Sequence, residues 1–167
     1  MNKGIYFVLF FIFLALLQVL ILNNIQFLGF VNPYLYISFV FFFPLKNNRF
    51  PFLFFAFLLG LTIDLFSNSG GIHAFSTVFI AYIRLVFIRL IFKKTESDYL
   101  LFNLRLEPFG KVFNYVVILT TIHHFILFSL ENFSTQNFTN VIVKTLFSSV
   151  FTLVLFFLGS TIFNKKQ

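Results

Sequence analysis

Six long runs of apolar residues, separated by short polar stretches, make up most of this chain. A helix needs about 20 mostly apolar residues to cross a bilayer, and most of these runs approach that length. We therefore expect an all-α polytopic membrane protein, a single domain over residues 1–167, with spans over residues 5–22, 30–45, 50–66, 72–92, 112–130 and 141–163. The second run is the least regular, because Asn32, Pro33 and Pro44 bound it. A short tilted helix and a re-entrant segment both fit it.

The first run, residues 5–22, resembles the core of a signal peptide, but it is long. The sequence NNIQFLG that follows it offers no small-x-small cleavage site. We therefore interpret it as an uncleaved membrane anchor.

Basic residues predict the orientation of the spans, because cytoplasmic loops are enriched in lysine and arginine. With six spans, the loops on one side hold no lysine or arginine, and we expect both termini to be cytoplasmic. The basic residues of the other side are Lys3, Lys46, Arg49, Lys93, Lys94, Arg105, Lys111, Lys165 and Lys166.

The largest loop on the basic side covers residues 93–111. Apolar and polar residues alternate in it from Phe102 to Glu107, which indicates either a short strand or a segment lying on the membrane surface.

Composition agrees with a membrane protein, since 59% of the residues are hydrophobic and 10% are charged. The absence of cysteine excludes disulfides, thiolate metal sites and cysteine nucleophiles. The net charge of +7 does not predict nucleic-acid binding, because the charges sit in loops where they orient the spans. The same loops predict contact with lipid headgroups.

Asp64 is notable because the predicted spans hold no other acidic residue. A carboxylate near the edge of a span usually has a partner or a function. Ala56, Gly60 and Asp64 are spaced by four, so they share one helix face, and small residues on such a face allow close helix packing. The plainer interpretation is that Asp64 caps the next turn or binds a nearby amide.

The turn after Asp64 leads directly to His73. Gly70 and Gly71 indicate a tight turn with positive φ. His73 is either a solvated residue at the start of a helix or a partner of Asp64 across the hairpin.

Lys144, about one turn into the sixth span, is the natural counter-ion for Asp64, unless it extends to the lipid headgroups. His123 and His124 are adjacent, so they point about 100° apart and cannot readily chelate one metal. A metal site built from Asp64, His73 and one of them is conceivable, but we predict no metal, no cofactor and no catalytic constellation.

The residues Gly60-Leu61-Thr62-Ile63-Asp64, then a short turn, Gly71, His73 and Ala74 resemble a pattern of the rod shape-determining MreD family. Six spans and cytoplasmic termini agree with that family. The resemblance implies a fold like the substrate-binding subunit of energy-coupling-factor transporters. It gives the positions of the motif no enzymatic role.

The resemblance implies a non-enzymatic scaffold in the bacterial inner membrane, within the elongation machinery that inserts side-wall peptidoglycan. The implied partners are an MreC-like bitopic protein and, through it, MreB-like actin, a RodA-like glycosyltransferase and a class B penicillin-binding protein. The alternative is a subunit that binds a small molecule or lipid-linked precursor for transport. Its pocket would be lined by Asp64, His73, Lys144 and His123.

Overall fold

Five long helices run the length of the molecule in the computed structural model, which describes residues 3–27, 29, 31–45, 48–95, 98–99, 102–132 and 138–164. They are α1 (Lys3–Leu20), α3 (Phe50–Ser67), α4 (Ile72–Phe87), α5 (Phe109–Glu131) and α6 (Phe138–Asn164). A π-helical turn, η3 (Ile88–Phe92), extends α4. Within the described residues, five helices are long and apolar enough to cross a membrane, as in a multi-pass membrane protein.

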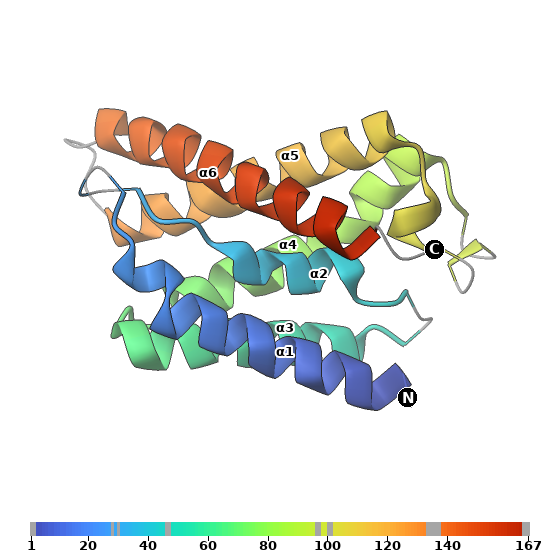
Figure 1. Cartoon of the computed structure of the whole chain (residues 1–167), viewed down its shortest axis with the longest axis horizontal. Coiled ribbons are helices and arrows are strands. Elements are labelled where there is room, and N and C mark those ends of the chain that lie inside the picture. The colour runs from blue at the N-terminus through green and yellow to red at the C-terminus, as the bar shows by residue number, and fades with distance from the viewer. Residues whose placement is uncertain are drawn as a thin grey trace.

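The second expected span, residues 30–45, is not a membrane-length helix, and this corrects the prediction of six. Residues 31–34 have no helical structure, and a 3₁₀ turn, η2 (Leu35–Ile37), leads into the short helix α2 (Ser38–Phe42). The segment nevertheless passes from one end of the molecule to the other (Figure 1), so it is not re-entrant. The start of α1 and the end of α6 consequently lie at the same end.

We call residues 31–42 the central segment. Pro33 disfavours a helix at its start, and the segment is also too short to cross a bilayer as a continuous α-helix. As a continuous α-helix, the segment would be only about 18 Å long at 1.5 Å per residue. With an extended start at about 3.3 Å per residue and a 3₁₀ turn at about 2 Å per residue, it covers about 27 Å. That length approaches the hydrocarbon thickness of a bilayer, about 30 Å.

The central segment forms the core around which the long helices pack. Tyr36, Ile37 and Val40 are fully buried, and Phe39 and Phe41 are 1% exposed. The segment contacts α1, α4 and α6. In Figure 1, α1 and α6 lie on either side of it.

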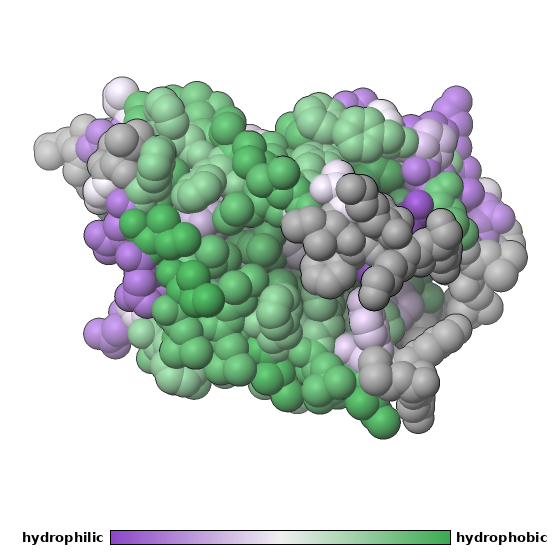
Figure 2. Space-filling view, in the orientation of Figure 1, coloured by the Kyte–Doolittle hydropathy of each residue, from purple (hydrophilic) through white to green (hydrophobic). Residues whose placement is uncertain are grey.

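The outer face of the bundle is apolar between two polar ends, as Figure 2 shows. Large apolar side chains on this face are more than half exposed, for example Phe13 at 54%, Tyr82 at 69% and Val150 at 60%. In water this surface would be strongly unfavourable, but it matches a lipid environment.

Residues 102–107 of the loop over residues 93–111 form no strand, which was one of the two interpretations of their alternating pattern. They include a 3₁₀ turn, η5 (Leu104–Leu106), which begins where the Asn103 side chain accepts a hydrogen bond from the backbone N–H of Arg105. Leu104 packs into the core, whereas Leu106 is 80% exposed. The basic residues Lys46, Lys165 and Lys166 lie outside the described residues.

Candidate functional site

The backbones of α3 and α4 approach each other closely at Gly60. A Cβ atom added at Gly60 would lie 2.5 Å from Ala74 Cα and 2.6 Å from both Ala74 N and His73 O. Such distances are far inside van der Waals contact, so the backbone of α4 fills the space that any side chain would need. Ala56, one turn earlier, is fully buried. The face of Ala56, Gly60 and Asp64 is thus a seam within the chain, as expected.

Asp64 caps the first turn of α4 from the neighbouring helix. The backbone N–H of His73 donates to Asp64 Oδ1 (3.0 Å), and that of Ala74 donates to Oδ2 (2.8 Å). The Ser69 hydroxyl donates to Oδ1 (2.5 Å). These amides belong to the donors that an α-helix leaves unpaired at its start, and a carboxylate there also interacts favourably with the helix dipole.

The glycines of the turn explain why the cap comes from another helix. Gly70 has φ of 68° and Gly71 has φ of 98°, in the left-handed region that favours glycine. Gly71 is the N-cap residue of α4 and has no side chain to accept a hydrogen bond. Asp64 supplies the missing acceptor, so Gly60, Asp64, Gly71, His73 and Ala74 form one structural unit, which we call the α3–α4 joint.

His73 meets Asp64 through its backbone, while its imidazole points into the core. The Tyr36 hydroxyl lies 2.9 Å from His73 Nδ1 and 3.0 Å from His123 Nε2. A hydroxyl can donate to one ring nitrogen and accept from the other, so Tyr36 links α4 to α5 across the central segment. His73 is buried rather than solvated.

His124 closes a second chain of hydrogen bonds. Its Nδ1 lies 2.8 Å from the carbonyl oxygen of Thr120, which can only accept, so Nδ1 carries the proton. Its Nε2 then accepts from the Thr152 hydroxyl (3.1 Å), and Thr152 Oγ1 in turn accepts from the backbone N–H of Tyr34 (2.9 Å). The chain fixes the orientation of the His124 ring and satisfies an amide of the central segment.

Other polar side chains also bind the backbone of the central segment. Gln18 Nε2 of α1 donates to the Pro33 carbonyl (3.0 Å), and Arg84 Nη2 of α4 donates to the Phe41 carbonyl (3.0 Å). Arg84 Nε also donates to the Tyr115 hydroxyl (3.1 Å). Because lipid offers no hydrogen bonds, non-helical backbone at this depth must find partners in the protein. Much of the buried polarity therefore holds the central segment in place.

Sequence reasoning missed Tyr34, Tyr36, Gln18 and Thr152 as members of this network. A signal for them was present: a run interrupted by Pro33 leaves backbone groups that require polar partners elsewhere. Their identity depends on which helices surround the segment, and the sequence pattern does not reveal that arrangement.

Lys144 is not the counter-ion of Asp64, which was one of the two interpretations that the sequence left open. Its Nζ lies 3.7 Å from Glu131 Oε2, at the end of α5, and 5.7 Å from the centre of the Phe128 ring. The amides of α4 already satisfy Asp64, which removes the need for a cation. No group of three or more metal-binding residues occurs among the described residues, so the conceivable site of Asp64, His73 and one further histidine does not form there.

What this arrangement can do chemically is limited by its packing. Asp64 is 5% exposed, and both of its oxygens accept hydrogen bonds. Such a carboxylate stabilises a helix start and is poorly placed to exchange protons with a substrate. The site is therefore structural: it consists of the α3–α4 joint and the buried hydrogen-bond network that His73 connects to it. Comparison of the chain with protein-family models, curated proteins and solved structures finds no match.

Proposed function

We propose that this protein is a non-enzymatic membrane scaffold of the MreD type, acting in side-wall peptidoglycan synthesis and rod shape determination. The proposed partner is an MreC-like bitopic protein, which would connect the chain to MreB-like actin, a RodA-like glycosyltransferase and a class B penicillin-binding protein. The proposed location is the bacterial inner membrane, with both termini in the cytoplasm on the basic side.

The observation that carries the proposal is that the motif residues hold α3 and α4 together inside the bundle. Gly60 and Ala74 bring two helices into contact, and Asp64 binds the amides of His73 and Ala74. Each of these positions serves the internal geometry of the bundle. A motif used in this way supports a protein whose contribution is a fixed shape in the membrane, and it leaves the outer surface for partners.

The outer surface gives a scaffold the contact area that it needs. Exposed apolar side chains cover the lipid-facing sides of α1 and α6, among them Phe13, Leu16 and Val150. Since lipid is as apolar as these side chains, a partner's span must gain its affinity from close packing and a few polar bonds. The proposed likeness to the substrate-binding subunit of energy-coupling-factor transporters belongs to the same proposal and rests on the family resemblance.

The transport alternative receives less support from the geometry. It placed Asp64, His73, Lys144 and His123 around a pocket open to the outside. Three of these residues are buried and hydrogen-bonded, while Lys144 lies beside Glu131. The cavity of about 650 Å³ between α1 and α6 is lined by none of these four residues.

The direct test is to purify the tagged chain from its own host in a mild detergent and to identify the co-purifying proteins by mass spectrometry. We expect MreC-like, RodA-like or penicillin-binding partners. Depletion of the chain should turn rod-shaped cells round, and the tagged chain should restore the rods. Retained rod shape together with recovery of an ATPase pair and its coupling subunit would refute the scaffold role.

The contact face can then be located with single cysteines, because the natural chain has none. Leu16→Cys on α1, Tyr82→Cys on α4 and Val150→Cys on α6 place a thiol on three lipid-facing positions outside the groove between α1 and α6. A crosslink to the MreC-like protein from one of them, and not from the other two, would assign the face. Equal crosslinking from all three would argue against a specific seam.

A further inference from the structure

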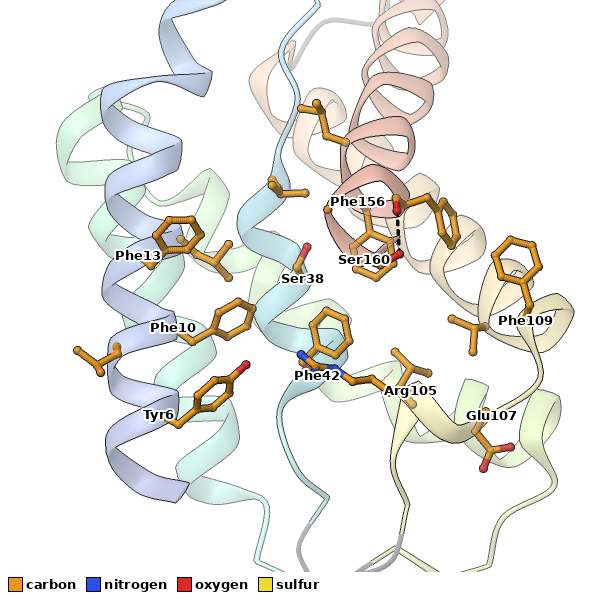
Figure 3. A pocket seen from close by; sticks show the side chains of 18 residues that line it. Tyr6, Phe10, Phe13, Ser38, Phe42, Arg105, Glu107, Phe109, Phe156 and Ser160 are labelled. Atoms are coloured by element: carbon orange, nitrogen blue, oxygen red, sulfur yellow. Dashed lines mark hydrogen bonds between the residues drawn. The ribbon is translucent and has the colours of Figure 1, made fainter. Parts of the chain in front are cut away.

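A cavity of about 650 Å³ opens between α1 and α6, at the end of the bundle where α1 begins and α6 ends (Figure 3). Its floor is the central segment, which the two helices leave uncovered there. Most of its lining is apolar, and the side chains that define it include Leu9, Phe10, Phe13, Leu35, Phe42 and Phe156. The volume lies within the range of ligand sites, about 300–1,000 Å³.

The mouth of this groove carries an arginine that has no acidic partner among the described residues. Figure 3 shows Arg105 extending from the loop before α5 toward Phe42, and its guanidinium carbon lies 5.4 Å from the centre of that ring. Within the part of the chain that the structure describes, the guanidinium has this ring contact and no carboxylate. Glu107 also lines the groove, but it pairs with Lys94 at 3.0 Å.

We propose that the groove binds an anionic diacyl phospholipid. The phosphate is held by Arg105, whose planar guanidinium suits phosphate oxygens. An acyl chain lies among the phenylalanines of α1 and α6 that line the groove. The groove thus offers a cationic group at its mouth and an apolar lining, which match the phosphate and the hydrocarbon of a phospholipid.

The size of the groove favours a lipid over a partner's helix. A helix about 10–12 Å across encloses about 400–600 Å³ in each turn of 5.4 Å. The groove therefore has the volume of little more than one turn, whereas a span needs about 20 residues. This proposal concerns a different surface from the α3–α4 joint and holds whether or not the scaffold role is correct.

The test is native mass spectrometry of the full-length purified chain, titrated with phosphatidylglycerol or with phosphatidylcholine carrying identical acyl chains. We expect phosphatidylglycerol to bind about tenfold more tightly, because the choline ammonium of phosphatidylcholine offsets the charge of the phosphate that Arg105 holds. Arg105→Gln should weaken phosphatidylglycerol more than phosphatidylcholine and so remove the preference. Lys111→Gln is the matched control, since it removes the same charge near the same loop but does not line the groove.

Two further variants separate the groove from the headgroup contact. Gly159 lines the groove, and a Cβ added there meets nothing within 4 Å, so Gly159→Leu should fill the space and weaken both lipids. Gly110→Leu, also in open space but outside the groove, should change neither.

The proposal fails if Arg105→Gln and Lys111→Gln bind phosphatidylglycerol alike, because the preference would then reflect general charge. It fails equally if Gly159→Leu binds both lipids as tightly as the natural chain. A crosslink from a cysteine at position 159 to another protein, with no lipid retained, would assign the groove to a partner instead.

Discussion

Replacement of Gly60 by alanine tests the central structural claim, that the backbones of α3 and α4 touch at this glycine. The added Cβ would lie 2.5 Å from Ala74 Cα, whereas carbon atoms prefer a separation of about 3.5–4.0 Å. The two helices must therefore move apart by about 1 Å. The obstacle is backbone on a rigid helix, so no side chain can rotate away to relieve it.

The same displacement would weaken the cap. The bonds from His73 N and Ala74 N to Asp64 are 3.0 and 2.8 Å long, and an increase of about 1 Å takes them beyond hydrogen-bond range. Overpacking typically costs about 1–3 kcal/mol, and loss of an N-cap costs about 0.5–2 kcal/mol. Gly60→Ala should therefore lower the free energy of unfolding by about 2–4 kcal/mol.

Gly159→Ala is the matched control, because it makes the same chemical change within a helix where a Cβ meets nothing within 4 Å. Alanine in a helix interior is about 0.5–1 kcal/mol more favourable than glycine, so this variant should be neutral or stabilised. The assay is reversible unfolding of the purified chain in mixed micelles with a graded fraction of denaturing detergent. Equal stability of the two variants would refute the close approach of α3 and α4.

Three other substitutions test the remaining contacts by the same assay. Asp64→Ala should destabilise the chain by about 1–2 kcal/mol through the lost cap, with Asp64→Asn costing less because it keeps an acceptor; equal costs would argue that the charge, and not hydrogen bonding, is what matters. Thr152→Val should cost about 1–3 kcal/mol, because it leaves the Tyr34 amide and His124 unpaired, and Thr161→Val on the exposed face is its control; similar losses from both would refute the buried chain. Lys144→Gln should change stability by less than about 1 kcal/mol, since its pair with Glu131 is partly exposed; a loss as large as that of Asp64→Ala would restore the counter-ion hypothesis.

Much of the fold was predictable because a bilayer imposes simple rules on sequence. The predicted span over residues 50–66 corresponds to α3 (Phe50–Ser67), and the one over residues 72–92 corresponds to α4 with its π-helical extension. Their boundaries are marked by Pro51 and by the glycine turn. The region of residues 30–45 failed as a helix because Pro33 and its short length favoured an extended backbone, which hydropathy alone does not distinguish from a helix.

The candidate site was predictable as a group of residues but not as a set of contacts. The spacing of Ala56, Gly60 and Asp64 indicated a packed face, and the structure places that face against α4. The choice between Lys144, the His73 imidazole and backbone amides as partners of Asp64 was left open. It depends on distances of a few ångströms between helices, and residue spacing does not fix those distances.

By itself, the sequence determined the membrane class, the long helices and the positions of the turns, because burial in lipid and backbone geometry act on each segment locally. Only the tertiary structure decided that residues 31–42 form the core, and that Gln18, Arg84 and Thr152 serve its backbone. The physical reason is that the non-helical backbone of this segment needs hydrogen-bond partners inside the protein, and these partners come from helices far apart in sequence. Which groups meet is therefore a property of the assembled bundle.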